Sequence, residues 1–274
     1  MGPVVAVDGG QVLGTSRLGV NAFLGIPYAA PAVGRGRYRE PQPVVPWTGQ
    51  RDATRHGPTP AQTPYPAPMD AVLPSSVTPG ADYLNVSVWA PSEGENLPVM
   101  VWLPGGAFVR GANSITTYDG SAFARDGVVV VGVNYRLGAP GFAVLDGAPT
   151  NLGLRDQIAA LAWVRENVAA FGGNPDQVTL FGESAGAMSV ATLMASPAAQ
   201  GLFHRAIVQS GGATVACSLE DARLISAELA ASWACPPRPR RSASSTRTTC
   251  SPLRPLWRWP SWPIRTPSGG VPAS

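Results

Sequence analysis

Runs of apolar residues and stretches with regular spacing divide the first 235 residues into strands and helices. Three short runs are apolar almost throughout, which is typical of strands buried on both faces of a sheet: 99–103, 128–134 and 178–181. In residues 82–89 polar and apolar side chains alternate, and this pattern predicts a strand nearer the edge of the sheet. Residues 4–8 and 11–18, joined by Gly9 and Gly10, predict an N-terminal antiparallel hairpin.

Helical spacing occurs between and after these runs. In residues 154–171 the large apolar side chains recur every three or four positions, and Gly172, Gly173 and Pro175 end the pattern. Three later elements are predicted in the order helix, strand and helix: 185–195, 206–210 and 219–231. Strands that alternate with helices indicate an α/β fold, in which a mostly parallel central sheet is flanked by helices on both faces. The loops after the strands are then expected to carry the chemistry.

Two regions show neither the alternation of a strand nor the spacing of a helix. Residues 27–80 are rich in Pro and Gly and predict long connections. Residues 236–274 hold nine Pro, seven Arg and three Trp but no Asp or Glu, and the Pro spacing excludes an interior helix or central strand. The tail is interpreted as a disordered segment, as a basic nucleic-acid-binding arm, or as translation in a shifted frame. We favour the shifted frame because the change at Pro236 is abrupt, and we take residues 1–235 as the folded domain.

The charge distribution argues against a nucleic-acid partner for that domain. The chain has 274 residues, a formal net charge of +3 and a pI near 9.0. The tail accounts for this positive charge, because it holds seven Arg and no acidic residue. The formal net charge of residues 1–235 alone is −4. Three cysteines are too few for a disulfide framework or a zinc site, so we expect no metal and no other cofactor. The sequence shows no leader-like segment and no apolar run of membrane length, which favours a cytoplasmic protein without a membrane partner.

The candidate chemistry lies at the end of the third apolar run, in Gly182-Glu183-Ser184-Ala185-Gly186. A strand, a sharp turn and a helix form the setting in which Gly-x-Ser-x-Gly presents a nucleophilic serine. The two glycines allow strand and helix to approach closely. Ser184 would then lie on a strained turn at a helix N-terminus, whose partial positive charge favours a developing anion. The motif indicates acyl transfer through an ester of Ser184.

A glycine loop after the first apolar run complements this serine. Residues 101–103 lead into Pro104-Gly105-Gly106-Ala107, where bare backbone N–H groups could point at a substrate oxygen. With the N–H of Ala185, those of Gly106 and Ala107 would form a three-donor oxyanion hole. An ordinary tight turn is the alternative, which we disfavour because Ser184 follows a later strand of the same parallel sheet.

Several stretches of the chain match one family in the same order: 23–29, 46–49, 84–91, 134–138, 151–175 and 203–211. Residues 181–186, Phe-Gly-Glu-Ser-Ala-Gly, are identical to the signature of that family. Residues 1 to about 233 thus resemble the N-terminal half of a type-B carboxylesterase, an α/β-hydrolase family that includes bacterial para-nitrobenzyl esterases and cholinesterases. The resemblance implies a truncated α/β-hydrolase fold and a small-molecule carboxylic ester as substrate. It also implies Ser184 as nucleophile and Gly106, Ala107 and Ala185 as oxyanion donors.

The chain departs from the family pattern at three places. Ala81-Asp82-Tyr83 stands where members usually have Glu-Asp-Cys, so the N-terminal disulfide of the secreted members is not expected. Pro104 stands where His or Tyr is common. Members of the family are much longer and carry the catalytic acid and histidine in their second half, so the triad is expected to be incomplete in this chain.

Neither histidine of the chain is expected to replace the missing base. His204 precedes the strand predicted at 206–210, so it lies at the end of the sheet opposite to the active-site loops. At about 3.3 Å per residue this separation is roughly 15–20 Å. His56 lies in the connection rich in Pro and Gly, where no geometric argument supports a catalytic role.

Other chemistry-bearing side chains are expected to be structural. We predict that Glu183 is a buried carboxylate held by backbone N–H groups rather than a charge that tunes the site. Asp156 is predicted to be a hydrogen-bonding residue of the long helix rather than a triad acid. Three tryptophans in strand and helix contexts are predicted to lie in the core rather than in a substrate gorge: Trp89, Trp102 and Trp163.

The sequence therefore predicts a serine carboxylesterase that works through an acyl-enzyme on Ser184 and whose activity is limited by the missing histidine and acid. The alternative is a catalytically inactive hydrolase-fold fragment or interaction protein, which the intact Gly-Glu-Ser-Ala-Gly motif disfavours. No pattern in the sequence specifies an oligomeric state or a particular physiological ester.

Overall fold

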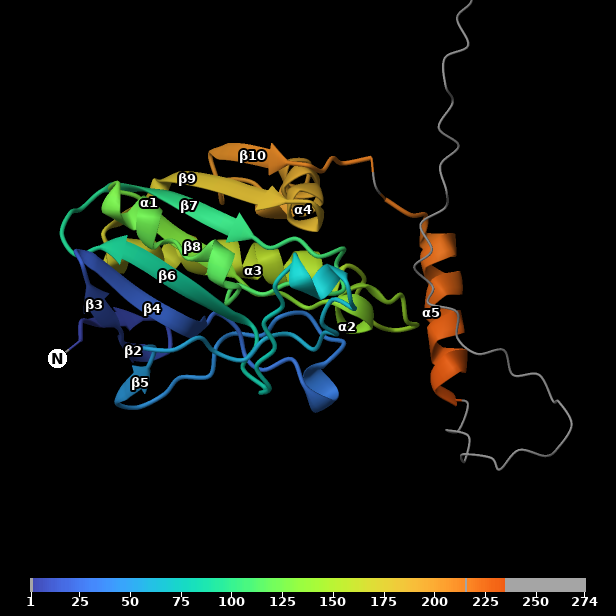
Figure 1. Ribbon diagram of the computed structural model, residues 1–274. Helices are drawn as coiled ribbons and strands as arrows, with labels where there is room; N and C mark the ends of the chain where they lie inside the picture. Colours follow the sequence, from blue (N-terminus) through green and yellow to red (C-terminus); the bar gives the residue numbers. More distant parts are fainter. Residues whose placement is uncertain (1, 215, 235–274) are drawn as a thin grey trace, which may run out of the picture. The chain divides into compact units, whose positions relative to one another are not determined.

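The computed structural model describes residues 2–214 and 216–234 (Figure 1). The chain divides into two compact units, the first ending at Ser226 and the second beginning at Ala227. The tail predicted at 236–274, with the three interpretations given for it, lies outside the described residues. Within the described part, no helix is long and apolar enough to cross a membrane.

A seven-stranded sheet dominates the described residues, with the strand order β10-β9-β7-β8-β6-β4-β3. The four strands from β10 to β8 run parallel to one another, whereas the pairs β8–β6, β6–β4 and β4–β3 are antiparallel. The strands are β3 (Thr15–Arg17), β4 (Val20–Pro27), β6 (Asn85–Pro91), β7 (Leu97–Leu103), β8 (Val129–Val133), β9 (Gly173–Glu183) and β10 (Arg205–Gln209). All strands predicted from apolar runs are present, and the α/β class is confirmed.

Strand β6 is the one whose place in the sheet was predicted wrongly. It lies between β4 and β8 and is buried along most of its length, so it is an interior strand rather than one near an edge. Its polar side chains are buried against polar partners instead of facing water. Asn85 accepts a 3.1 Å hydrogen bond at Oδ1 from Asn113, and Ser87 Oγ lies 3.2 Å from Nδ1 of His56. The alternation in sequence therefore arises from a buried polar face.

The N-terminal hairpin is present but shorter than predicted. Strands β1 (Val4–Val7) and β2 (Gly10–Leu13) pair antiparallel, and β5 (Gln50–Asp52) completes a small second sheet. The predicted second arm, 11–18, is split at Gly14, and its remainder forms β3 of the main sheet. A Cβ at Gly14 would lie 2.6 Å from the carbonyl oxygen of Ala22, so glycine permits the close approach of β4 at this break.

The helices are α1 (Ser121–Arg125), α2 (Gly138–Phe142), α3 (Leu152–Asn167), α4 (Ala185–Met194) and α5 (Leu219–Ala234). Short 3₁₀ turns are η1 (Gly34–Gly36), η2 (Met69–Ala71), η3 (Thr116–Tyr118), η4 (Val168–Phe171) and η5 (Pro197–Ala199). Together α3 and η4 span the long helix that the sequence predicts. Gly172 ends it with φ of 81°, a left-handed conformation that favours glycine.

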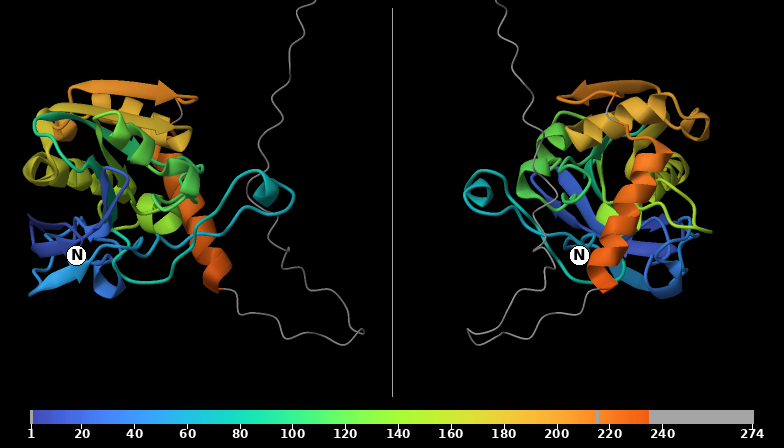
Figure 2. Two further views of the ribbon diagram at one scale, coloured as in Figure 1. Left: turned by 60° about the vertical axis from the view of Figure 1, so that its left-hand side comes forward. Right: turned by 90° about the vertical axis from the view of Figure 1, so that its right-hand side faces the viewer.

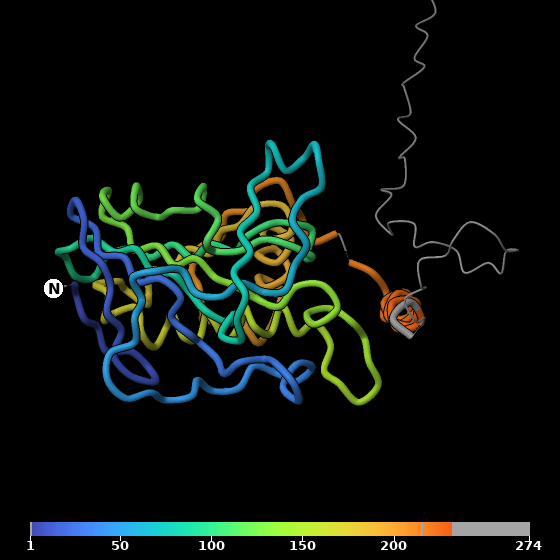
Figure 3. Tube along the Cα trace, turned by 60° about the horizontal axis from the view of Figure 1, so that its bottom comes forward, coloured from blue at the N-terminus to red at the C-terminus, as the bar shows by residue number. Residues whose placement is uncertain are grey.

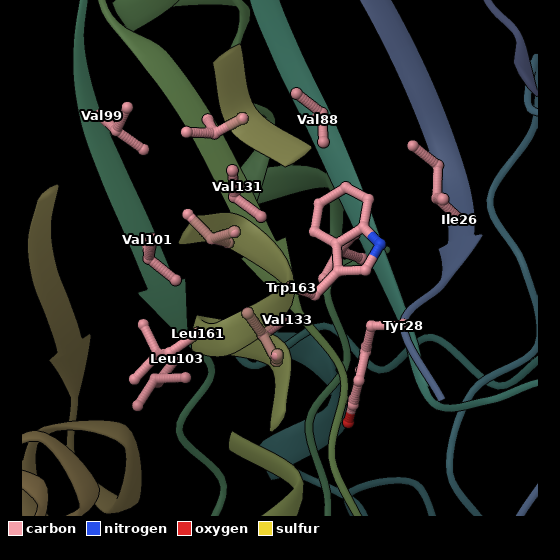
Figure 4. Close-up of a cluster of buried hydrophobic side chains, with 14 of the residues drawn as sticks. Ile26, Tyr28, Val88, Val99, Val101, Leu103, Val131, Val133, Leu161 and Trp163 are labelled. Carbon is pink, nitrogen blue, oxygen red and sulfur yellow. The ribbon is translucent and has the colours of Figure 1, made fainter. Parts of the chain in front are cut away.

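The two faces of the main sheet are covered by different helices. Val99, Val101 and Leu103 of β7 face α3, where they pack with Leu161 and Trp163 in the main core (Figure 4). Two apolar side chains of α4 join this core, Val190 and Leu193. The opposite face carries a smaller cluster in which Ala124 of α1 packs with Trp89 and Val130. Helices on both faces, and burial of the three predicted core tryptophans, are confirmed.

A buried ion pair joins the end of β8 to α3. The Arg136 guanidinium donates two hydrogen bonds to Asp156, 2.7 Å from Nε to Oδ2 and 2.6 Å from Nη2 to Oδ1. The remaining Nη1 donates to the carbonyl oxygens of Arg37 and Arg39, 3.0 Å and 2.7 Å away. Burial raises the pKa of the Asp156 carboxyl, and the hydrogen bonds from Arg136 oppose that rise. The prediction that Asp156 is a structural hydrogen-bonding residue is confirmed.

Candidate active site

Strand β9 leads directly into helix α4 (Figure 1). Ser184 is the single residue between them. Its φ of 54° and ψ of −120° lie in a region that non-glycine residues rarely adopt. The backbone is held from both sides, because Ser184 N donates to the carbonyl oxygen of Gln209 and Ser184 O accepts from Met188 N, each at 2.9 Å. Such strain persists only where the surrounding structure enforces it, and it is concentrated at functional sites.

Glycines make this turn possible. A Cβ at Gly186 would overlap the carbonyl oxygen of Leu103, and one at Gly182 would lie 2.6 Å from the carbonyl carbon of Gly186. Strand β9, helix α4 and the end of β7 are therefore closer to one another than any side chain allows. The close approach that the motif predicts is confirmed, and we call residues 182–186 the elbow.

The glycine loop, residues 104–109, begins directly beside the elbow. A Cβ at Gly105 would lie 2.6 Å from Oε2 of Glu183 and 3.2 Å from Cβ of Ser184, so the loop packs directly against both residues. Gly106, Ala107 and Phe108 have φ of 121°, 54° and 60°. The start of the loop is fixed by the buried Tyr135, whose hydroxyl donates a 2.8 Å hydrogen bond to Pro104 O. Burial raises the pKa of Tyr135, so this hydroxyl keeps its proton at neutral pH.

The backbone N–H groups of Gly106, Ala107 and Ala185 donate to no atom in the described part of the chain. Ala185 is buried, Gly106 is half-buried and Ala107 is exposed. Unpaired N–H groups beside a reactive side chain are what an oxyanion site requires. Their assignment as oxyanion donors stays a prediction, which the experiments below test.

Glu183 differs from its prediction. The side chain is exposed, and none of its carboxylate oxygens accepts a hydrogen bond from the described residues. It follows Gly182 at the very end of β9, and its carboxylate lies against the glycine loop, since a Cβ at Gly105 would lie 2.6 Å from Oε2. Its charge reaches Tyr118, whose pKa is raised chiefly by burial and further by Glu183. Glu183 is therefore an exposed charge beside Ser184, not a buried structural carboxylate.

Neither histidine contacts Ser184. The exposed His204 directly precedes the amino end of β10, as predicted, and its Nδ1 atom lies 3.3 Å from Val178 N in the middle of β9. His56 lies against Ser87 of β6, three strands away from β9 in the sheet order. At about 4.8 Å per strand this separation is roughly 14 Å. Burial lowers the pKa of His56, and Asp119 opposes that shift.

The structure adds contacts near the site that the sequence did not indicate. Trp102 and Phe181 lie on the sheet face opposite α3, with ring centroids 4.8 Å apart, and Tyr118 lies 5.0 Å from Trp102. Beyond the glycine loop, Arg110 lies over the ring of Tyr65, and Gln62 donates a hydrogen bond to Gly111 O. Gln62 lies in the region without periodicity, so no pattern in the sequence could have found it.

Neither of two clefts on the surface includes Ser184. One, of about 380 Å³, lies between residues 41–44 and α3, and the other, of about 390 Å³, follows α4 at residues 193–203. Among the described residues, no group of three or more His, Cys, Asp or Glu side chains is placed to hold a metal ion. Beside Ser184 the described residues offer its hydroxyl, backbone N–H groups and the carboxylate of Glu183.

The sheet order, the elbow and the adjoining glycine loop define the N-terminal part of an α/β-hydrolase. A solved structure of a PNB esterase superposes with a TM-score of 0.80 at 44% identity, covering 85% of this chain and 49% of that one. A thermophilic PNB esterase gives a TM-score of 0.79 at 45% identity, with the same coverage of both chains. The truncated α/β-hydrolase fold is confirmed.

Sequence comparison identifies the family. The profile of the Carboxylesterase family matches residues 1–254. Para-nitrobenzyl esterase of Bacillus subtilis (strain 168) is 50% identical over 218 residues, which are 76% of this chain and 43% of that protein. Human cocaine esterase is 45% identical over 227 residues, 76% of this chain and 40% of that protein. The chain belongs to the carboxylesterase family, and it spans less than half the length of these relatives.

Proposed function

We propose that this protein is a serine carboxylesterase in which Ser184 attacks the carbonyl carbon of a small carboxylic ester. The observation that carries the proposal is the strained backbone of Ser184 at the elbow, directly beside the glycine loop. The name of the Bacillus relative, a para-nitrobenzyl esterase, supports a carboxylic ester as the substrate class. The reaction is acyl transfer to a hydroxyl, and it requires no cofactor.

The chain supplies the nucleophile and the charge stabilisation for the first half of this reaction. The N–H groups of Gly106, Ala107 and Ala185 would donate hydrogen bonds to the carbonyl oxygen as it becomes an oxyanion. A bond then forms between Ser184 Oγ and the carbonyl carbon, the Oγ proton passes to solvent, and the alcohol leaves with a proton from solvent. Water hydrolyses the resulting ester of Ser184 and releases the acid.

No histidine is placed to act as general base for Ser184 among the described residues. The chain contains two histidines, and neither contacts Ser184. Without a base, a serine hydrolase typically loses about 10⁴–10⁶ of its rate and keeps the part that the oxyanion site and binding provide. We therefore expect slow acylation of Ser184. The same observation favours the second candidate, a catalytically inactive hydrolase-fold protein that acts by interaction.

A fluorophosphonate probe separates the two candidates. We expect slow labelling of the full chain, confined to Ser184 by peptide mapping and absent from Ser184→Ala. Ser218→Ala is a matched control, since Ser218 is an exposed serine at the start of another helix, and it should label as the parent does. Lack of labelling at Ser184 in folded protein would overturn the esterase and favour the interaction protein.

The cytoplasmic location, and the lack of nucleic-acid and membrane partners, enter as part of the same proposal. They are supported by the charge of residues 1–235 and by the apolar pattern of the sequence. Cell fractionation and a gel-shift assay with the full chain test them.

A further inference from the structure

Residues 59–78 form a closed loop that begins and ends at one point. Thr59 N donates to Thr78 O at 2.9 Å, and Thr78 N donates to Thr59 Oγ1 at 3.0 Å. The segment between them, which carries η2, stands out from the sheet as a cyan loop in Figures 2 and 3. Its ends are close and it lacks strands, as in an Ω-loop, a type of loop that is frequently functional.

Only three side chains between residues 61 and 80 are withdrawn from solvent: Gln62, Tyr65 and Ser76. Each of the three faces residues 110–114, which continue the glycine loop. The Tyr65 ring lies 4.4 Å below the guanidinium carbon of Arg110, and Ser76 Oγ accepts a 2.8 Å hydrogen bond from Ser114. The closed loop is therefore attached to the chain that leaves the active site.

Gln62 makes the most directional of these contacts. Its Nε2 donates to Gly111 O at 3.0 Å, and its Oε1 accepts from Gly111 N at 2.8 Å. A primary amide is the neutral side chain that pairs with the N–H and the C=O of one residue at once. Both backbone groups of Gly111 are thus fixed by one side chain.

Gly111 transmits this constraint to the glycine loop without any flexible side chain. A Cβ at Gly111 would overlap the carbonyl oxygen of Gly105, so the two backbones are in contact. Gly106 O accepts hydrogen bonds from Val109 N and Arg110 N, both at 3.1 Å, which closes the turn between them. Gly105, Gly106 and Gly111 carry no side chain that could hold this turn, and glycine has the largest conformational freedom of all residues.

We propose that Gln62 is a positioning residue for the oxyanion site. It holds the peptide groups of Gly111, and through them it fixes the direction of the Gly106 and Ala107 N–H groups toward Ser184. The inference rests on the proposed function, because these N–H groups affect a rate only if Ser184 is acylated. Gln62 itself does not touch the substrate.

The test compares Gln62→Met with Gln42→Met in the full chain. Methionine keeps the length of the side chain and removes both hydrogen bonds to Gly111, together with the 3.3 Å bond that Nε2 donates to Pro60 O. Gln42 is a matched control, because it is exposed and its amide donates only to nearby carbonyl oxygens, those of Glu40 and Pro41. Two quantities are measured: the saturation kinetics of Ser184 acylation by a p-nitrophenyl ester, and hydrogen–deuterium exchange of the peptide that covers residues 104–114.

We expect Gln62→Met to lower the maximal acylation rate by about 10–100-fold, below the effect of losing a complete oxyanion donor. The ester concentration at half-saturation should stay within about twofold, since uniform binding is unaffected. Exchange at 104–114 should become faster, and Gln42→Met should match the parent protein in both measurements.

The two ways of failing are distinguishable. If the parent protein is acylated and Gln62→Met is acylated at the same maximal rate, the positioning role is overturned while the esterase stands. If the parent protein is not acylated at all, the proposed function fails. Hydrogen–deuterium exchange then tests whether Gln62 holds the loop. Faster exchange at 104–114 in Gln62→Met supports the positioning role, and unchanged exchange overturns it. Thermal unfolding midpoints of Gln62→Met and Gln42→Met that match each other show that both variants are folded in these measurements.

Discussion

The ends of β9 and β8 lie at the same edge of the parallel sheet, yet they are stabilised in opposite ways. After β8, Asn134, Tyr135 and Arg136 are all buried, and their polar atoms bond to residues far away in the sequence. After β9, Ser184 is held by backbone hydrogen bonds and by glycine packing, and its hydroxyl has no partner among the described residues. A reactive side chain stays free where the backbone alone holds the turn. A structural strand end instead uses its side chains as the supports.

The largest expected effect lies at the end of β8. Asp156→Asn leaves Arg136 buried without a counter-charge, since the exposed fractions of the two side chains are 1% for Arg136 and 0% for Asp156. Removing one partner of a buried ion pair costs about 3–5 kcal/mol. Chemical denaturation of the variant and the parent protein measures this difference.

Glu40→Gln is the control for that experiment. It breaks the pair between Arg155 and Glu40, whose side chains are 44% and 53% exposed. An exposed pair contributes about 1 kcal/mol or less. Equal losses in the two variants would contradict the structural role that we assign to the buried pair.

The elbow should respond to added volume rather than to lost charge. In Gly186→Ala the new Cβ meets the carbonyl oxygen of Leu103, which is backbone and cannot move aside cheaply. We expect a loss of about 1–3 kcal/mol or more in the free energy of unfolding, as for overpacking of a dense interior. Gly212→Ala is the matched control, because a Cβ there meets nothing within 4 Å. If Gly186→Ala and Gly212→Ala have the same free energy of unfolding, the close approach of β7 and α4 does not constrain the elbow.

Strain at Ser184 predicts a smaller effect of opposite sign. Glycine adopts positive φ readily, so Ser184→Gly should release part of the roughly 1–3 kcal/mol stored in such a backbone conformation. The greater freedom of glycine in the unfolded chain offsets about 0.4–1 kcal/mol of this gain. We expect Ser184→Gly to be about 1 kcal/mol more stable than Ser184→Ala, which keeps a Cβ. A variant Ser184→Gly that is less stable than Ser184→Ala would show that the turn is not strained.

The smallest expected effect is the pH dependence from His56. Burial lowers the pKa of this imidazole below its ordinary value of 6.5, so the unfolded chain binds the proton more readily than the folded one. The contribution of neutral His56 to stability is therefore complete above pH 6.5. It is lost as the pH falls from there through the folded-state pKa.

His56→Gln isolates this contribution. Unfolding free energies at pH 7.5 and pH 5.5 should differ less in the variant than in the parent protein. An unchanged difference would show that His56 titrates alike in both states. His56 lies against Ser87 of β6 and not against Ser184. A pH dependence that disappears in His56→Gln therefore reports on the polar side of β6 and not on the end of β9.

Local pattern was sufficient wherever neighbouring residues determine the conformation. The apolar runs predicted β7, β8 and β9, and the three- and four-residue spacing with Gly172 predicted α3 and its end. The Gly-Glu-Ser-Ala-Gly sequence placed Ser184 on its turn, because the small residues and the backbone geometry that they permit are contiguous in the chain.

Pattern failed where partners come from distant segments. Strand β6 alternates like an edge strand, but Asn113 and His56 bury its polar face from other parts of the chain. Glu183 was expected to be buried from its place in the motif, whereas its exposure depends on what covers the end of β9.

The sequence by itself determined the α/β class, the strands of the parallel sheet, the elbow serine and the family to which the chain belongs. These properties reside in contiguous residues, whose spacing and size act locally. Two relations come from the tertiary structure alone: Gln62 pairs with Gly111 behind the glycine loop, and His56 lies away from Ser184. Those relations join segments separated by tens of residues, and they exist only once the sheet has brought the ends of its strands together.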